Sequence, residues 1–419
     1  MPEPTEAQLP PLRLKRDEDR RLLAGHLWIF SNEVDTAATP LTRFEPGALV
    51  RVLAHNDRSL GIAYVNPRSL ICARLLETHE VPDARWLTQR LRRARALRER
   101  LFAAPYYRLV HGEADGLPGL VVDRYATLAV VQIGTAGMER LKSALVAALR
   151  EGLGFETVVF KNDAAARALE GLPVYVETAA GGAAGEEASG SEVTGGEAAH
   201  AAERVRVVED GLEFEVMLLA GQKTGWFFDQ SANRALLERY VRPGDRVLDA
   251  FSYVGAWGVR AARAGARVTC IDSSAAALEL AQANAARNGL ALETRRGEAF
   301  AELERLQAEG ARFEVVIIDP PAFAKRRKDL PKALAAYKRL NQLAVQLLAP
   351  AGVLISCSCS YHVGAEDLER AIARAARAAH RHLVILAQGG QAPDHPVHPA
   401  IPESRYLKAY FCGVGDGLK

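Results

Sequence analysis

Two cysteines, Cys357 and Cys359, close an apolar run late in the chain, in the stretch VLISCSCS. Asp319 closes an earlier apolar run and is followed by two prolines. Prolines remove backbone donors and stiffen a loop, which leaves a carboxylate and carbonyl oxygens directed at a reacting centre. A thiolate at a strand end is a nucleophile that can form a covalent adduct. The two cysteines share a strand face, and Cys359 lies nearer the carboxyl end, so we predict Cys359 and Asp319 as the catalytic pair.

Three further features stand at predicted strand ends, in the order that an S-adenosylmethionine (SAM) site needs. Asp249 precedes a turn whose Gly255 lets the backbone approach a ligand and opens a helix N-terminus. Asp272 ends the next strand, where a carboxylate can accept hydrogen bonds from both ribose hydroxyls, or can instead cap the helix that comes after it. Glu298 follows a weaker strand, where an acidic side chain could accept the adenine amino group.

The elements that position these residues alternate regularly between strand and helix. Short apolar runs such as VVIID and VLISC carry no period of two, as expected of parallel strands that are buried on both faces. Such repeats predict a Rossmann-like, doubly wound and mostly parallel α/β sheet that binds ligands at the carboxyl ends of its strands and ends in an antiparallel hairpin. The predicted strands cover 246–251, 267–272, 292–296, 314–319, 352–358, 382–387 and 406–414. The predicted helices cover 255–264, 274–288, 299–309, 331–348 and 365–380.

Composition divides the rest of the chain. Residues 9–77 contain short apolar segments split by turn signals and predict a small β-rich domain. Residues 80–178, which begin with an arginine-rich helix near 83–102, predict a small α+β domain. The stretch 179–202 has no aromatic residue and almost no large apolar one, so we expect a flexible insertion. The methyltransferase domain would then cover 204–419.

Global composition excludes several classes of protein. The formal net charge of +2 gives no overall attraction to a polyanion, so that any nucleic-acid surface must come from local clusters. No signal peptide and no membrane-spanning apolar stretch is present in the sequence. The five cysteines are scattered without a C-x-x-C pair, which favours reduced thiols in a cytoplasmic protein. The histidines are not spaced as metal ligands, and we expect no metal site.

The segment GQKTGWFFDQSANR at 221–234 places glycine, lysine, three aromatic residues and Asp-Gln in one stretch ahead of the first predicted strand. It is interpreted either as a lid over the methionine end of the cofactor, or as a turn and a capped helix with buried Trp226 and Phe227. The acid-Pro-Pro loop resembles that of methyltransferases acting on amino groups or ring atoms of nucleobases.

Taken together, these motifs closely resemble the bacterial 23S rRNA cytosine-C5 methyltransferases that carry an N-terminal PUA domain. The shared motifs span nearly the whole chain: HLWIFSNEV, RLVHGEADGLPGLVVDRY, GQKTGWFFDQ, VLDAFSYVG, DPPAFAK, SCS and DHPV. The resemblance implies ribosomal RNA as the partner, a PUA module in the first domain, and Cys359 as the catalytic cysteine. It implies SAM-binding roles for Gln230, Asp249, Phe251, Tyr253, Gly255, Asp272, Glu298 and Asp319.

In the chemistry that this resemblance implies, a thiolate adds to C6 of cytosine and turns the ring into an enamine, whose C5 takes the methyl group. Removal of the C5 proton and elimination of the thiolate then release the product. Many other RNA cytosine-C5 methyltransferases place a second cysteine where this chain has Pro321, so the proton-removing group is unidentified. A basic run directly after the loop predicts phosphate contact and consists of Lys325, Arg326, Arg327 and Lys328.

Two other functions stay open at this point. An enzyme that methylates adenine N6 or guanine N2 also uses an acid-Pro-Pro loop, but it needs no thiol and usually has an aromatic residue where this chain has Ala322. A non-catalytic RNA-binding assembly factor could retain a SAM pocket, although the presence of Asp249, Asp272, Asp319 and Cys359 argues against decay of the site. The oligomeric state and the cytosine that is modified cannot be read from the sequence.

Overall fold

The computed structural model describes residues 5–76, 78–179, 204–218 and 224–416. The predicted insertion at 179–202 therefore lies outside the described residues except for Ala179, as do the first three residues of GQKTGWFFDQ. Two compact units make up the described chain. The first contains residues up to Val205, and the second contains most of the residues after it. Two short segments, 217–226 and 394–404, belong to the first unit although their neighbours in sequence belong to the second.

The first unit begins with a small five-stranded sheet in the order β1-β3-β4-β5-β2, as the sequence predicts for a β-rich module. Its strands are β1 Pro11–Arg13, β2 Trp28–Phe30, β3 Ala48–Leu53, β4 Ser59–Val65 and β5 Ile71–Leu75, and a short helix, α1 Arg20–Leu23, precedes β2. Only β1 and β3 run parallel, and the other pairs are antiparallel. Alternate side chains such as Val50 and Val52 of β3 are fully buried in its core.

A second sheet in the same unit has the order β10-β9-β8-β7-β6. Its strands are β6 Tyr106–His111, β7 Leu120–Tyr125, β8 Leu128–Ile133, β9 Thr157–Asn162 and β10 Tyr175–Thr178. Helix α2 (Ala84–Glu99) begins at Asp83, whose carboxylate accepts from the Trp86 backbone N–H at 2.6 Å, and it buries Leu87, Leu91 and Ala94 at helical spacing against the sheet. The helical segment after β8 is divided into α3 Ala136–Arg140, α4 Lys142–Ala147 and a π turn, Ala148–Gly152.

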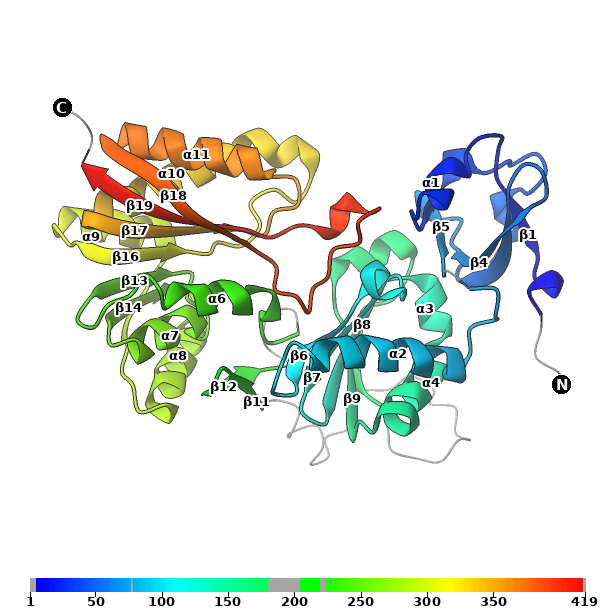
Figure 1. Ribbon diagram of the computed structural model, residues 1–419, viewed down its shortest axis with the longest axis horizontal. Helices are drawn as coiled ribbons and strands as arrows, with labels where there is room; N and C mark the ends of the chain where they lie inside the picture. The colour runs from blue at the N-terminus through cyan, green and yellow to red at the C-terminus, as the bar shows by residue number, and fades with distance from the viewer. Residues whose placement is uncertain (1–4, 77, 180–203, 219–223, 417–419) are drawn as a thin grey trace. The chain divides into compact units, whose positions relative to one another are not determined.

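The second unit is built on a seven-stranded sheet with the order β15-β14-β13-β16-β17-β19-β18 (Figure 1). The first five strands are parallel, and β19 is antiparallel to both of its neighbours, so the predicted fold with its C-terminal antiparallel hairpin is confirmed. The strands are β13 Arg246–Ala250, β14 Arg267–Asp272, β15 Glu293–Arg296, β16 Phe313–Ile318, β17 Leu348–Ser358, β18 Arg381–Gly390 and β19 Lys408–Asp416. A separate hairpin of β11 Arg204–Glu209 and β12 Leu212–Met217 precedes this sheet in sequence.

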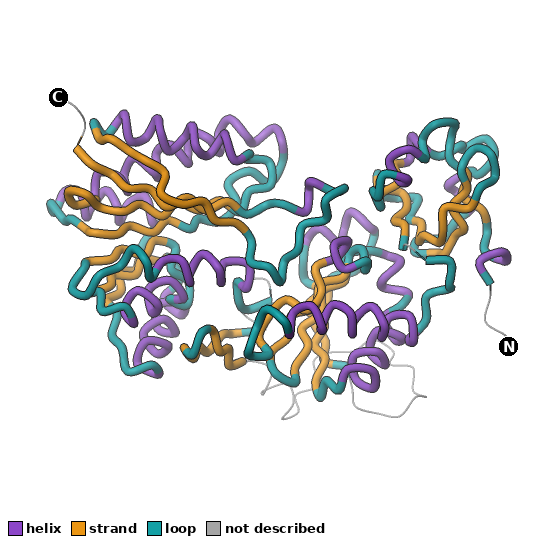
Figure 2. The backbone as a smooth tube through the Cα atoms, viewed as in Figure 1, coloured by secondary structure: helices purple, strands orange, loops and turns teal. Residues whose placement is uncertain are grey.

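Helices cover both faces of this sheet (Figure 2). One face packs against α9 Ala299–Ala308, α10 Leu330–Leu347 and α11 Ala365–Ala378, and the other packs against α6 Ser231–Leu237, α7 Ala256–Arg263 and α8 Ala275–Arg287. The central strand β16 shows why its sequence is apolar without interruption. Val316 and Ile318 belong to the core beneath α10, whereas Val315 and Ile317 belong to the core beneath α7. The polar rim of the sheet is therefore its carboxyl-terminal edge. The predicted site residues stand at this edge.

Candidate active site

Asp319 follows the last residue of β16 and is held by two donors on one carboxylate oxygen. Its Oδ2 accepts from Trp257 Nε1 at 3.1 Å and from Gln230 Nε2 at 2.9 Å. Burial raises the pKa of Asp319 to about 6, and the bond from Trp257 acts in the opposite direction. The carboxyl group is thus mostly ionised at neutral pH, and both protein donors are on the same oxygen.

The amide of Gln230 has a fixed orientation. Its Oε1 accepts from Asn233 Nδ2 at 2.6 Å, so its amino group must be the part that donates to Asp319. Asn233 also donates to the Gly390 carbonyl at 2.9 Å, and a Cβ at Gly389 would lie 2.0 Å from Asn233 Oδ1. Gly389, near the end of β18, therefore lets α6 approach closely enough to orient Gln230. The sequence motif predicted Gln230, but it gave no indication of Asn233 or Gly389.

Asp249 is completely buried in β13. Its Oδ2 accepts from the Gly258 backbone N–H at 3.0 Å, while its Oδ1 has no hydrogen-bond partner among the described residues. Burial, reinforced by the negative charge of Asp319, raises the pKa of Asp249 to about 8. A Cβ at Gly258 would lie 2.7 Å from Cys270 Sγ, so this close approach of helix and strand requires glycine.

The turn after β13 adopts a backbone conformation that is rare outside glycine. Phe251 has a φ of 65° and Tyr253 a φ of 49°, and Gly255 comes next at 80°. Such left-handed residues concentrate at ligand sites. The Phe227 and Tyr253 rings meet edge to face with centroids 5.7 Å apart, whereas Trp226 is buried in the first unit.

Asp272 connects this turn to the next strand. Its Oδ2 accepts from the Tyr253 backbone N–H and its Oδ1 from the Ser274 backbone N–H, both at 2.9 Å. Helix α8 is capped by Ser274, whose side chain accepts from the Ala277 backbone N–H, so the alternative in which Asp272 is the cap is wrong. Glu298 follows β15 with an exposed side chain that makes no capping bond to α9.

The two neighbouring cysteines have different surroundings. Cys357 is fully buried in the core beneath α7, and burial raises the pKa of its thiol well above the ordinary value. Cys359 lies one residue beyond the end of β17, is only partly buried, and has its Sγ 3.9 Å from the carbonyl oxygen of Pro320. The other cysteines, Cys72, Cys270 and Cys412, are buried. Cys359 is therefore the one cysteine of the described residues that combines access with proximity to the Asp-Pro-Pro loop.

Three further residues lie near this cysteine, and the sequence gave no role to two of them, Tyr337 and Lys408. Ser360 Oγ lies 3.1 Å from the hydroxyl of Tyr337, which comes from α10. Lys408 stands opposite Ser358 in the register of β17 and β19, and its Nζ donates to the carbonyls of Ser360 at 2.6 Å and Tyr406 at 2.8 Å. Burial lowers the pKa of Lys408 to about 8. In the sequence, the available signal for Lys408 was its charge at the start of the apolar strand KAYFC.

The two predicted basic clusters differ. Lys325, Arg326, Arg327 and Lys328 are all exposed and lie between β16 and α10, directly after the Asp-Pro-Pro loop. In α2, Arg98 is completely buried, so the helix is not a uniform basic surface. Arg85, Arg92, Arg93 and Arg100 remain exposed.

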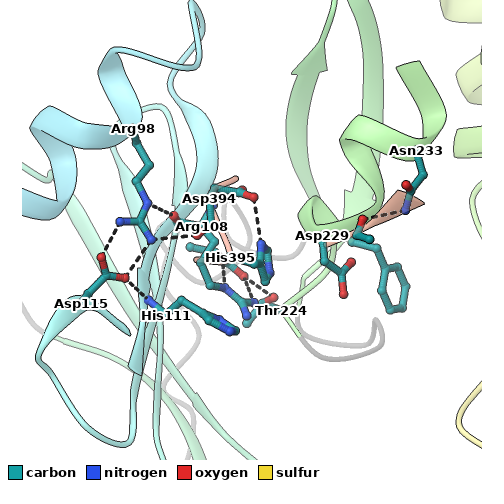
Figure 3. Close-up of polar contacts among 12 residues, drawn as sticks. Arg98, Arg108, His111, Asp115, Thr224, Asp229, Asn233, Asp394 and His395 are labelled. Carbon is teal, nitrogen blue, oxygen red and sulfur yellow. Dashed lines mark hydrogen bonds and ion pairs between the residues drawn. The ribbon is translucent and has the colours of Figure 1, made fainter. Parts of the chain in front are cut away.

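Arg98 belongs to a buried network that anchors the segment 394–404 within the first unit (Figure 3). It pairs with Asp115 through both terminal nitrogens and donates to the Asp394 carbonyl at 2.8 Å. Asp394 Oδ2 accepts from the Arg108 backbone N–H at 2.9 Å, and its Oδ1 lies 2.9 Å from His395 Nδ1. The DHPV and RLVHGEAD motifs, which are far apart in sequence, therefore pack against each other.

A pocket of about 340 Å³ lies in the first unit. Its lining includes Trp28, His111 and Ile401, but none of the predicted site residues. Within the part of the chain that the structure describes, no group of three or more His, Cys, Asp or Glu side chains could hold a metal ion. No helix among those residues is both long and apolar enough to cross a membrane.

Comparisons with known proteins agree with this geometry. A PUA-like domain matches residues 12–78, and the S-adenosylmethionine-dependent methyltransferase family matches residues 186–408. Proteins named ribosomal RNA large subunit methyltransferase I are similar over their full length. The one from Klebsiella pneumoniae strain 342 is 34% identical, with 98% of this chain and 100% of that protein covered. The one from Cronobacter sakazakii is also 34% identical, covering 96% and 99%.

Solved structures show the same fold. A Streptococcus mutans protein described as a SAM-dependent methyltransferase superposes with a TM-score of 0.76 at 20% identity, covering 97% of this chain and 100% of that one. A methyltransferase complexed with SAH gives the same values. The match of the methyltransferase family to more than half of the chain, together with the full-length relatives, identifies the protein as a member of the S-adenosylmethionine-dependent methyltransferases with an N-terminal PUA-like domain.

Proposed function

We propose that the protein transfers a methyl group from SAM to C5 of a cytosine in large-subunit ribosomal RNA, through a covalent adduct with Cys359. The RNA class is supported by relatives that are named for this substrate and match over their whole length. The observation that carries the covalent mechanism is the position of Cys359, which is partly exposed 3.9 Å from the Pro320 carbonyl while its neighbour Cys357 is fully buried. A base-amino methyltransferase would have no use for such a thiol.

The residues at the strand ends fit SAM, which supplies the electrophilic methyl group when it is bound. Asp249 Oδ1 is a buried oxygen without a hydrogen-bond partner among the described residues, so it can form a hydrogen bond with a polar group of a ligand. Each Asp272 oxygen accepts one backbone N–H and retains capacity for a ribose hydroxyl. Glu298 would accept the adenine amino group. Phe251, Tyr253 and Gly255 would form the turn that frames the cofactor, and Gln230 would hold the edge of its pocket.

Asp319 would orient the target base. Its Oδ2 is occupied by the Trp257 and Gln230 donors, which leaves Oδ1 to accept from the exocyclic amino group of cytosine. The thiolate of Cys359 adds to C6, and the resulting enamine takes the methyl group at C5. Loss of the C5 proton and elimination of the thiolate then restore the aromatic ring and free the cysteine. The cytosine must leave its stack to enter such a pocket.

RNA binding would be shared between the PUA-like domain and the exposed basic run Lys325–Lys328. Four positive charges beside the catalytic loop can contact phosphates without reading sequence. They would hold the backbone of the nucleotides that flank the extruded cytosine.

The test is a trapped adduct. RNA with 5-fluorocytosine at the target should form a denaturant-resistant complex with the wild-type protein and SAM, because fluorine at C5 cannot leave as a proton. We expect peptide mapping to place the crosslink on Cys359, and Cys359→Ala to lose both adduct and methylation while it still binds SAM. Cys357→Ala is the matched control and should retain substantial activity. A crosslink on Cys357, or methylation by Cys359→Ala, contradicts the covalent role of Cys359.

A further inference from the structure

Lys408 is placed where its charge can act on the proposed nucleophile. It begins β19 opposite Ser358, the residue before Cys359. Its Nζ donates to the carbonyl of Ser360, the residue after Cys359, at 2.6 Å. The lysine side chain therefore lies along the strand end that carries the cysteine. A second bond, to the Tyr406 carbonyl at 2.8 Å, fixes the ammonium group from the other side.

The other titratable groups around this cysteine come from three further elements. Asp319 precedes the Pro320 carbonyl that Cys359 Sγ contacts, Tyr337 reaches in from α10, and Cys357 lies on β17. All three are neutral or negative, and none of them can favour a thiolate by charge. The Arg234 guanidinium also acts on Asp319, but it is paired with both carboxylate oxygens of Glu209. Lys408 is thus the cation whose contacts place it beside the strand end that carries the thiol.

We infer that Lys408 is a positioning residue for the nucleophile, whose ammonium group holds Cys359 as the thiolate that attacks the cytosine ring. The inference rests on the proposed function, because it assigns Lys408 a role only if Cys359 is the nucleophile. The thiol proton passes to solvent as the thiolate forms, so no additional reactant is needed. An adjacent cation is a recognised cause of thiolate stabilisation in catalytic cysteines.

Electrostatics agrees with this role. Burial lowers the pKa of Lys408 to about 8, while the negative charge of Cys359 acts to raise it. The lysine is therefore still charged at neutral pH, and each partner of the pair favours the charged form of the other. A lysine that only tied β19 to β17 would fulfil its two hydrogen bonds without any effect on thiol ionisation. The two roles differ in what happens to the pH dependence of Cys359.

The decisive readout is the alkylation rate of Cys359 by iodoacetamide as a function of pH, measured by peptide mass spectrometry without RNA. Lys408→Met should raise the midpoint of the Cys359 alkylation profile by about one pH unit. Because one pKa unit changes the thiolate fraction tenfold, alkylation at pH 7 should then be slower by roughly tenfold. Lys408→Arg keeps the charge and should stay close to the wild type. Lys338→Met, which removes an exposed lysine of α10, is the matched control and should leave the profile unchanged. SAM affinity by calorimetry verifies that each variant is folded.

An unchanged profile in Lys408→Met would overturn the inference. If that variant lost SAM binding, Lys408→Arg decides the matter, since a midpoint raised by one unit despite the retained charge contradicts the electrostatic role. The fluorocytosine adduct separates this inference from the proposed function. Methylation by Cys359→Ala would contradict the covalent mechanism itself. If Lys408→Met forms the adduct on Cys359 at the wild-type rate, only the role of Lys408 is contradicted.

Discussion

The protonation of Asp249 makes a quantitative prediction about the stability of the second unit. Burial raises the pKa of this carboxyl group from the ordinary value of 3.8 to about 8. At every pH in that interval, the folded protein therefore keeps a proton on Asp249 that the unfolded chain has released. Because the folded state binds more protons than the unfolded state, the contribution of Asp249 to stability falls as pH rises from about 4 to about 8.

The magnitude is set by the pKa difference. Each pKa unit corresponds to about 1.4 kcal/mol, and titration is half complete at the folded pKa, so the loss between pH 6 and pH 8 is roughly 2 kcal/mol. Asp249→Asn keeps the shape of the side chain and the acceptor for Gly258, but it has no proton to lose. The variant should lose about 2 kcal/mol less stability than the wild type over the same interval.

Amide hydrogen exchange of peptides from β13 and β16 reports the opening free energy of this sheet without interference from the first unit. Exchange should be measured without SAM at pH 6 and pH 8, for the wild type and for Asp249→Asn. Subtracting the values for the two proteins cancels the contributions of groups that titrate independently of Asp249. Parallel loss of stability in both proteins would refute the assignment of a raised pKa to Asp249.

Three other predictions concern cofactor, scaffold and RNA. Asp272→Ala should weaken SAM binding without unfolding the domain, because it removes the proposed acceptor for the ribose hydroxyls; unchanged affinity by calorimetry would exclude Asp272 from the site. Arg98→Met leaves Asp115 buried without its cation, and should lower the free energy of unfolding of the first unit by about 3–5 kcal/mol in a denaturant titration. A loss below about 1 kcal/mol would contradict this prediction. Replacing Lys325–Lys328 by glutamines should weaken rRNA binding and flatten its salt dependence while SAM affinity stays constant, and an unaltered salt slope would show that these side chains do not contact phosphate.

The positions of the strands along the chain and the carboxylates at their ends were predictable because each is encoded locally. Runs such as VVIID specify a strand that is buried on both faces, and a carboxylate next to such a run must stand at its carboxyl end. The sequence favoured Cys359 over Cys357 only through its place nearer the carboxyl end and the family resemblance, since residues two apart share a strand face. What separates them is that β17 ends at Ser358, so that Cys359 emerges from the core.

Other features depend on contacts between residues that are far apart in sequence. Asn233 orients Gln230 only because Gly389 lets the end of β18 approach α6. Lys408 reaches the Ser360 carbonyl, next to Cys359, only because β19 inserts antiparallel beside β17. Arg98 resembled the other arginines of a basic helix, and its burial depends on Asp115 and on a segment nearly 300 residues later in the chain. Local patterns carry no record of such pairings.

Tritium release from RNA labelled at cytosine C5 tests the central proposal most directly. A large-subunit rRNA transcript made with [5-³H]cytidine is incubated with the protein and SAM that carries a ¹⁴C methyl group. Methylation at C5 must expel the hydrogen at that carbon, so we expect one tritium released to water for each methyl group incorporated. Methyl incorporation without tritium release would show that a base amino group or another atom is the acceptor, and would contradict cytosine-C5 methylation.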